Sequence, residues 1–148
     1  MSLNERIQSD MKDALRAGEK ERLSVIRMLV AAIKQREIDD RVELDDSDVL
    51  QIVEKLVKQR REAASQFADA GRDDLERKEL SEIDILAVYL PEPLAEDELE
   101  ALIAAAITST GASSMRDMGK VMNAVREQAQ GRADMAAVSA TVKAKLGA

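Results

Sequence analysis

Side chains able to contact a polyanion gather in the last quarter of the sequence. Residues 111–148 contain six basic and three acidic residues, a net charge of +3, whereas the rest of the chain carries −10. Arg116 and Lys120 are four residues apart, so a helix would place them on one face, which Asn123 joins. Basic side chains and bare backbone amides are the groups that contact phosphates. The candidate contact residues are Arg116, Gly119, Lys120, Asn123 and Arg132, with Lys143 and Lys145 as outer contacts.

The Gly-Lys pair within Asp117–Met122 invites comparison with a phosphate-binding P-loop. That motif needs glycine five positions before Gly119 and Ser or Thr after Lys120, where this chain has Ser114 and Val121, and no strand precedes it. The pattern places Gly119 in mid-helix, where glycine costs roughly 1 kcal/mol relative to alanine. A close helix crossing explains such a glycine better than a close ligand does.

The basic residues also have a structural interpretation that stays open. A charged helix face is usually solvent-exposed and has no ligand, and the negative charge of Glu127 reduces the net positive charge of this face. Gly131 is expected to end one helix and Asp134 to cap the next, so "GRAD" needs no ligand to account for it.

Composition argues against catalysis. The chain has no histidine and no cysteine, so it lacks the usual general base near neutral pH, the thiolate nucleophile and the commonest metal ligands. The acidic cluster of residues 39–48 lacks the spacing of a calcium loop. We therefore expect no enzyme, no catalytic residue, no cofactor and no metal site.

Targeting signals are not evident either. The first residues carry charges where a signal peptide needs an apolar core. No apolar run approaches the ~18 residues of a membrane span. These features predict a soluble, cytoplasmic protein without membrane association.

Apolar residues recur at helical spacing throughout, and nothing alternates like a strand, so we predict an all-α fold. Ser2 and Glu5 form a capping box for the first of seven helices, and Asp45 and Asp134 are expected caps of later ones. The second helix, about residues 19–38, is apolar around much of its girth and should be the most buried. Helix ends are expected at four glycines and before the proline segment: Gly18, Gly71, Leu90, Gly111 and Gly131.

Pro91 and Pro93 are the only prolines and cannot both lie inside a helix. We place a hinge there. The predicted organisation is a larger N-terminal domain of about four helices (1–90), a proline hinge (91–94) and a small C-terminal three-helix domain (95–148).

The motifs, taken together, resemble a known family. They are Glu21–Met28, Gly71–Leu75, Tyr89–Glu92, Gly111–Ser114 with Asp117–Met122, and Gly131–Asp134. In this order they closely resemble the stand-alone YqeY proteins of the GatB/YqeY family over almost the whole chain. Ala95 departs from the family pattern, which usually offers a Ser or Thr cap there.

The resemblance implies a function. The related segment of the B subunit of the glutamine-dependent aspartyl/glutamyl-tRNA amidotransferase is a helical tail that helps to hold the tRNA. A stand-alone copy looks like a tRNA-binding module without an active site. Two alternatives remain: a protein–protein adaptor using the N-terminal helices, and an accessory of the amidotransferase reaction, a carbon–nitrogen ligation with glutamine as amido donor.

Overall fold

The computed structural model describes residues 1–147, and these contain seven α-helices, one short 3-10 helix and no strand. The all-α prediction is therefore confirmed. The chain folds into two compact units, Met1–Leu90 and Pro91–Ala148.

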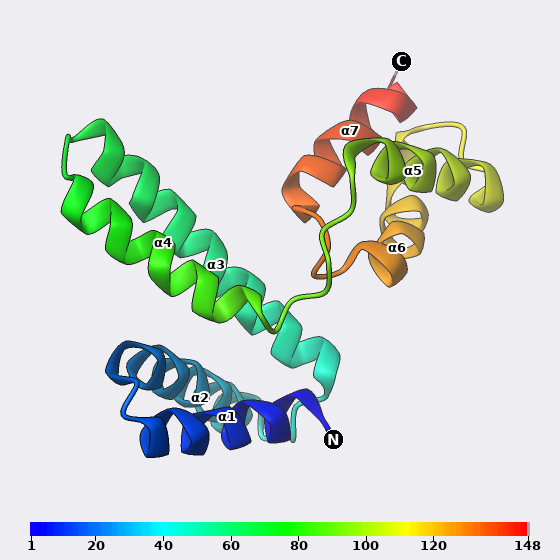
Figure 1. Cartoon of the computed structure of the whole chain (residues 1–148). Coiled ribbons are helices and arrows are strands. Elements are labelled where there is room, and N and C mark those ends of the chain that lie inside the picture. The colour runs from blue at the N-terminus through cyan, green and yellow to red at the C-terminus, as the bar shows by residue number, and fades with distance from the viewer. Residues whose placement is uncertain (148) are drawn as a thin grey trace. The chain divides into compact units, whose positions relative to one another are not determined.

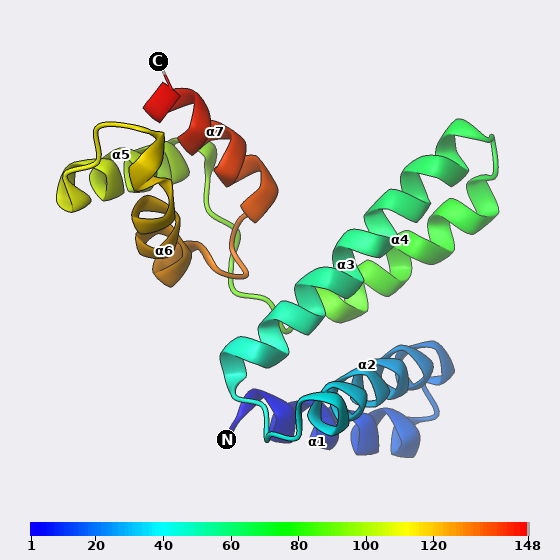
Figure 2. The same ribbon diagram turned by 180° about the vertical axis from the view of Figure 1, so that it is seen from behind.

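The N-terminal unit is built from two helical hairpins (Figures 1 and 2). Their helices are α1 (Leu3–Ala17), α2 (Lys20–Asp40), α3 (Asp46–Asp69) and α4 (Asp73–Ala87). The capping box at Ser2 and Glu5 is present, and Asp45 caps α3 through a second box with Asp48. Gly18 ends α1 with φ 70°, a left-handed conformation that suits a residue without Cβ.

Helix α2 contacts the other three helices of this unit. It buries Val25, Ile26, Leu29, Val30 and Ile33. Met28 is partly exposed, however, and α3 buries as many residues as α2. Four of the largest fully buried side chains nevertheless come from α2 and only two from α3, so the prediction that this helix is the most buried is confirmed, although α3 shares the core with it.

Helix α4 ends at Ala87, three residues before the predicted end at Leu90. Because a residue that precedes proline is disfavoured in the helical conformation, Pro91 explains why Leu90 is excluded. The chain leaves the helix through a turn, with the Tyr89 amide bonded to the Leu86 carbonyl at 3.2 Å.

The C-terminal unit consists of α5 (Glu96–Thr110), the 3-10 helix η1 (Met115–Asp117), α6 (Met118–Ala129) and α7 (Met135–Gly147). Helix α6 packs against both α5 and α7. The core of this unit contains Ile103, Val121, Val125, Val138 and Val142, all almost fully buried. Asp134 caps α7 by accepting from the Ala136 amide at 3.0 Å, as the sequence predicts. Ala95 gives α5 no side-chain cap.

Candidate nucleic-acid interface

Gly119 lies in the first turn of α6, because η1 precedes that helix and α6 begins only at Met118. The mid-helix placement predicted from the sequence is therefore wrong. A Cβ built on Gly119 would meet no atom within 4 Å, so the predicted close helix crossing is wrong too. The glycine leaves an open stretch of backbone at the start of α6.

Arg116 and Lys120 flank this glycine, and both side chains are exposed. Neither makes a hydrogen bond or ion pair within the described residues, although Lys120 interacts electrostatically with Asp117. The carboxylate of Asp117 accepts a hydrogen bond from the Ser113 amide at 3.0 Å. This bond lowers the pKa of Asp117, and the charge of Lys120 acts in the same direction. The two basic side chains therefore project from a turn that Asp117 holds in place.

Asn123 lies one turn further along α6 and is also exposed. Its side-chain oxygen accepts a hydrogen bond from Arg126 Nη1 at 3.3 Å. This bond orients Arg126 along the same helix, although the sequence analysis did not include Arg126 among the candidate contacts. The i,i+3 spacing of the pair is the signal that could have identified it.

Arg132 has a different environment from the other candidates. Its Nε donates to the Glu92 carbonyl at 2.9 Å, and its own carbonyl accepts from the Leu94 amide at 2.9 Å. These two bonds tie residues 92–94 to the middle of the α6–α7 connection. Arg132 could contact a phosphate with its remaining donors, but its orientation is set by the proline segment.

Lys143 and Lys145 are both exposed on α7. Since residues two apart on a helix do not face the same way, they cannot act as one patch. Of the seven candidates, the structure groups four in η1 and the first two turns of α6: Arg116, Gly119, Lys120 and Asn123.

The N-terminal unit contains a polar network that no pattern in the sequence predicts. The Tyr89 hydroxyl donates to Asp10 Oδ2 at 2.7 Å, and Arg22 lies 3.9 Å from Asp10 Oδ1. Burial raises the pKa of Tyr89, and the bond to Asp10 raises it further. The three residues belong to α1, α2 and the turn after α4, so only the tertiary fold brings them together.

Within residues 1–147, no group of acidic side chains is able to hold a metal ion, and no helix is long and apolar enough to cross a membrane.

The fold and the exposed basic turn define a two-unit helical protein with a candidate anion-contacting surface. Residues 4–146 match the model of the family described as "Yqey-like protein". The chain belongs to this family.

Curated relatives carry the name "Altered inheritance of mitochondria protein 41, mitochondrial". The relative from Pyrenophora tritici-repentis is 30% identical over 146 residues, which cover 97% of this chain and 80% of the relative. The relative from Eremothecium gossypii is 40% identical over 85 residues, covering 57% of this chain and 46% of the relative. The relative from Lachancea thermotolerans is 34% identical over 105 residues, which cover 69% of this chain and 56% of the relative. The last two alignments thus span about half of each relative.

These names overturn one prediction. The cytoplasmic location predicted from the sequence is wrong, because the relatives are named as mitochondrial proteins. Composition and the missing signal-peptide pattern did not bear on this question, because neither feature distinguishes the two compartments.

Proposed function

We propose that this protein is a non-catalytic RNA-binding module whose C-terminal unit contacts the phosphates of a structured RNA such as tRNA. The observation that carries the proposal is the exposed turn at the start of α6. There Arg116 and Lys120 flank Gly119, which is exposed and has open space where a Cβ would be.

Arg116 and Lys120 have no ion-pair partner among residues 1–147, so no internal salt bridge must break before they meet a phosphate. Gly119 lets a sugar–phosphate backbone approach more closely than any other residue would allow. The resemblance to the helical tail of a tRNA-dependent amidotransferase subunit supports tRNA as the ligand, and shape rather than base sequence is the expected basis of recognition.

Binding should be weak and sensitive to salt because the whole chain carries a net charge of −7. Three to five phosphate contacts correspond to a logarithmic salt slope of roughly −2 to −5. Affinity should therefore fall steeply as salt approaches the physiological range.

The experiment titrates labelled tRNA with the full chain at several salt concentrations. The double variant Arg116→Ala/Lys120→Ala should lower the affinity and reduce the magnitude of the salt slope by about 1.5, at 0.7–0.9 per lost contact. Lys58→Ala/Arg61→Ala is the matched control, since it removes the same two charges from exposed positions of α3. The control should keep the parental slope.

Equal losses of tRNA affinity and of salt slope in both double variants would show a non-specific effect of charge. Absence of tRNA binding by the parent at low salt would refute the proposal and favour the protein-adaptor alternative. The non-catalytic part is tested separately by measuring ATP consumption and ammonia release from glutamine. Turnover that disappears on changing one carboxylate or lysine of this chain would refute it.

A further inference from the structure

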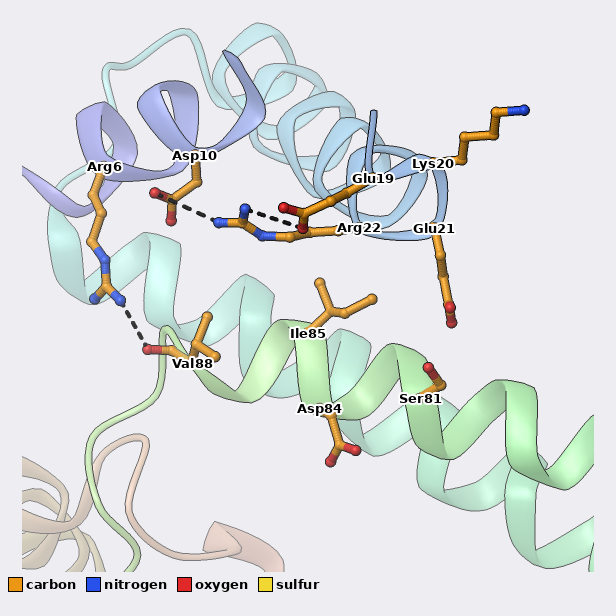
Figure 3. A pocket seen from close by; sticks show the side chains of 10 residues that line it. All are labelled: Arg6, Asp10, Glu19, Lys20, Glu21, Arg22, Ser81, Asp84, Ile85 and Val88. Carbon is orange, nitrogen blue, oxygen red and sulfur yellow. Dashed lines mark hydrogen bonds and ion pairs between the residues drawn. The ribbon is translucent and has the colours of Figure 1, made fainter. Parts of the chain in front are cut away.

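A cleft of about 690 Å³ opens in the N-terminal unit, between the α1–α2 hairpin and the second half of α4. Figure 3 shows its two walls. Arg6, Asp10 and Arg22 form the charged wall, and Ile85 of α4 and Val88, which follows that helix, face them. Glu21 and Arg22 of the first family motif line this cleft, whereas none of the proposed RNA contacts does.

The carboxylates nearest the middle of the cleft are already engaged. Asp10 accepts from the Tyr89 hydroxyl through one oxygen and faces Arg22 through the other. Glu19 lies 3.5 Å from Arg22. Lys20 and Asp84 extend away from the space between the walls, and Glu21 lies at one end near Ser81. The cleft therefore offers few unused hydrogen-bond acceptors at its centre.

The two arginines, by contrast, have donors to spare. Arg6 donates one bond, from Nη2 to the Val88 carbonyl at 3.3 Å, and its guanidinium lies 5.1 Å from the centre of the Tyr89 ring. Arg22 makes only the two ion-pair contacts at 3.5 and 3.9 Å among residues 1–147. Since a guanidinium carries five N–H donors, most of the donors on both side chains remain for a ligand.

The charge around the arginines limits which anion would fit. Asp10 and Glu19 lie beside Arg22 and would repel a doubly charged phosphate more than a singly charged carboxylate. A carboxylate also matches the planar fork of a guanidinium. The ligand group favoured by this wall is a carboxylate.

The opposite wall is apolar and unusually open. Val88 is 55% exposed, although valine is normally buried. Its side chain and that of Ile85 point toward the arginines in Figure 3. An apolar group seated on them would be removed from water together with Val88, which favours binding.

We propose that this cleft binds a carboxylate carried on an apolar body, held by Arg6 and Arg22 and covered on its apolar side by Ile85 and Val88. Two sources share this chemistry: a small organic acid, and the terminal carboxylate of a partner polypeptide with an apolar last residue. The proposal is independent of RNA binding, because it uses no residue of the C-terminal unit.

The test is a titration of the isotope-labelled full chain with hexanoate, followed by backbone amide NMR. Hexanol and hexylamine, which have the same apolar body, are the comparison ligands. Hexanoate should give saturable shifts at amides around Arg22 and Val88, and hexanol and hexylamine should give much weaker ones. Loss of a charged hydrogen bond should make Arg6→Gln bind about tenfold more weakly.

Val88→Ser provides a second variant, because an exposed side chain is not needed for folding, and it should also weaken hexanoate binding severalfold. Arg27→Gln and Val42→Ser, at exposed positions outside the cleft lining, are the matched controls and should bind as the parent does. The proposal is overturned if hexylamine binds as well as hexanoate, if the shifts lie elsewhere, or if Arg6→Gln and Val88→Ser leave the affinity unchanged.

Peptides ending in leucine, as the free acid or as the amide, distinguish the two sources. Tighter binding of the free-acid peptide than of hexanoate would identify a polypeptide terminus as the ligand. Equal or weaker binding would identify a small acid. Either result keeps the carboxylate site, whereas binding of the amide as tight as that of the free acid would overturn it.

Discussion

At the scale of single residues, side chains of one type have different roles in this chain. Arg116 extends into solvent from the turn before α6, whereas Arg132 donates to the Glu92 carbonyl and Arg22 lies between two carboxylates. Formal charge does not separate these roles, because it is the same in all three. The partner that the fold supplies determines which arginine is available to a ligand.

Tyr89 gives a prediction at this scale. Tyr89→Phe removes the hydroxyl that donates to Asp10 at 2.7 Å. Hydrogen bonds to charged groups contribute about 1.5–3 kcal/mol, and Arg22 still faces Asp10 in the variant, so we expect the free energy of unfolding to fall by about 1–2 kcal/mol. Urea denaturation measures this. An unchanged midpoint would mean that water replaces the hydroxyl at no cost.

The same hydroxyl predicts a dependence on pH. Burial and then the bond to Asp10 raise the pKa of Tyr89 above its ordinary value of 10.0. The unfolded chain therefore releases this proton at lower pH than the folded chain, so the stabilisation is complete below pH 10 and is lost as the pH rises above it. The stability difference between the parent and Tyr89→Phe should shrink above pH 10. A constant difference through that range would contradict the assignment.

At the scale of helices, two glycines that look alike in the sequence have different conformational requirements. Gly111 ends α5 with φ 66°, in the left-handed region. Gly119 lies inside the first turn of α6 with open space where a Cβ would be. Only the first of them is required by the backbone conformation.

Alanine substitution should separate the two glycines. Gly119→Ala should raise the free energy of unfolding by about 0.4–1 kcal/mol, because the helical conformation accepts alanine and the unfolded chain loses freedom. Gly111→Ala should lower it by about 1–2 kcal/mol, the cost of a left-handed alanine. Thermal or urea unfolding measures both. If Gly119→Ala is more stable yet binds tRNA more weakly, the glycine serves the ligand; parental tRNA affinity would instead remove Gly119 from the proposed interface.

Arg60 of α3 connects three helices. Its Nη1 donates to the Leu56 carbonyl at 3.0 Å, its Nη2 to Met28 Sδ of α2 at 2.9 Å, and its Nε lies 3.6 Å from Glu82 of α4. The side chains of Arg60 and Glu82 are only 11% and 19% exposed. The pair is therefore screened less than a surface salt bridge.

Removing one partner of this pair should cost more than removing both. Glu82→Ala leaves the Arg60 charge uncompensated, and we expect a loss of about 1–3 kcal/mol in the free energy of unfolding. Arg60→Met/Glu82→Leu, which replaces the pair with apolar groups, should recover much of that loss. A double variant less stable than Glu82→Ala would show that the ion pair itself stabilises the hairpin.

At the scale of the whole molecule, the proline segment forms part of the C-terminal unit, which begins at Pro91. The Glu92 carbonyl accepts from the Arg132 side chain, and the Leu94 amide donates to the Arg132 carbonyl. The C-terminal unit should therefore depend on residues that the sequence analysis assigned to a hinge. Any flexible point is expected before Pro91.

Fragments test this. Residues 91–148 should fold alone and unfold at higher urea concentration than residues 95–148, which lack both bonds to Arg132. A difference of about 1–3 kcal/mol corresponds to the two bonds, one of them from a charged donor. Arg132→Ala in the longer fragment is the matched control and should remove part of the difference. Equal stability of both fragments would return residues 91–94 to a simple hinge.

The sequence by itself determined the helices, because the signals that start and stop a helix act over a few residues. Ser2 with Glu5, Asp45 with Asp48, and the glycines at positions 18 and 111 lie where the helices begin or end. Local patterning did not predict where α6 begins. Because η1 precedes α6, Gly119 lies in the first turn of that helix and not in its middle.

Only the tertiary structure decided which polar side chains are engaged. Arg132 bonds to a carbonyl 40 residues away, and Tyr89 to a carboxylate 79 residues away. Such pairings depend on where the packing of helices places each backbone and side-chain oxygen, and no local sequence pattern encodes that distance. For the same reason the cleft of Arg6 and Arg22 was invisible in the sequence, while the exposed Arg116 and Lys120 could be named from spacing alone.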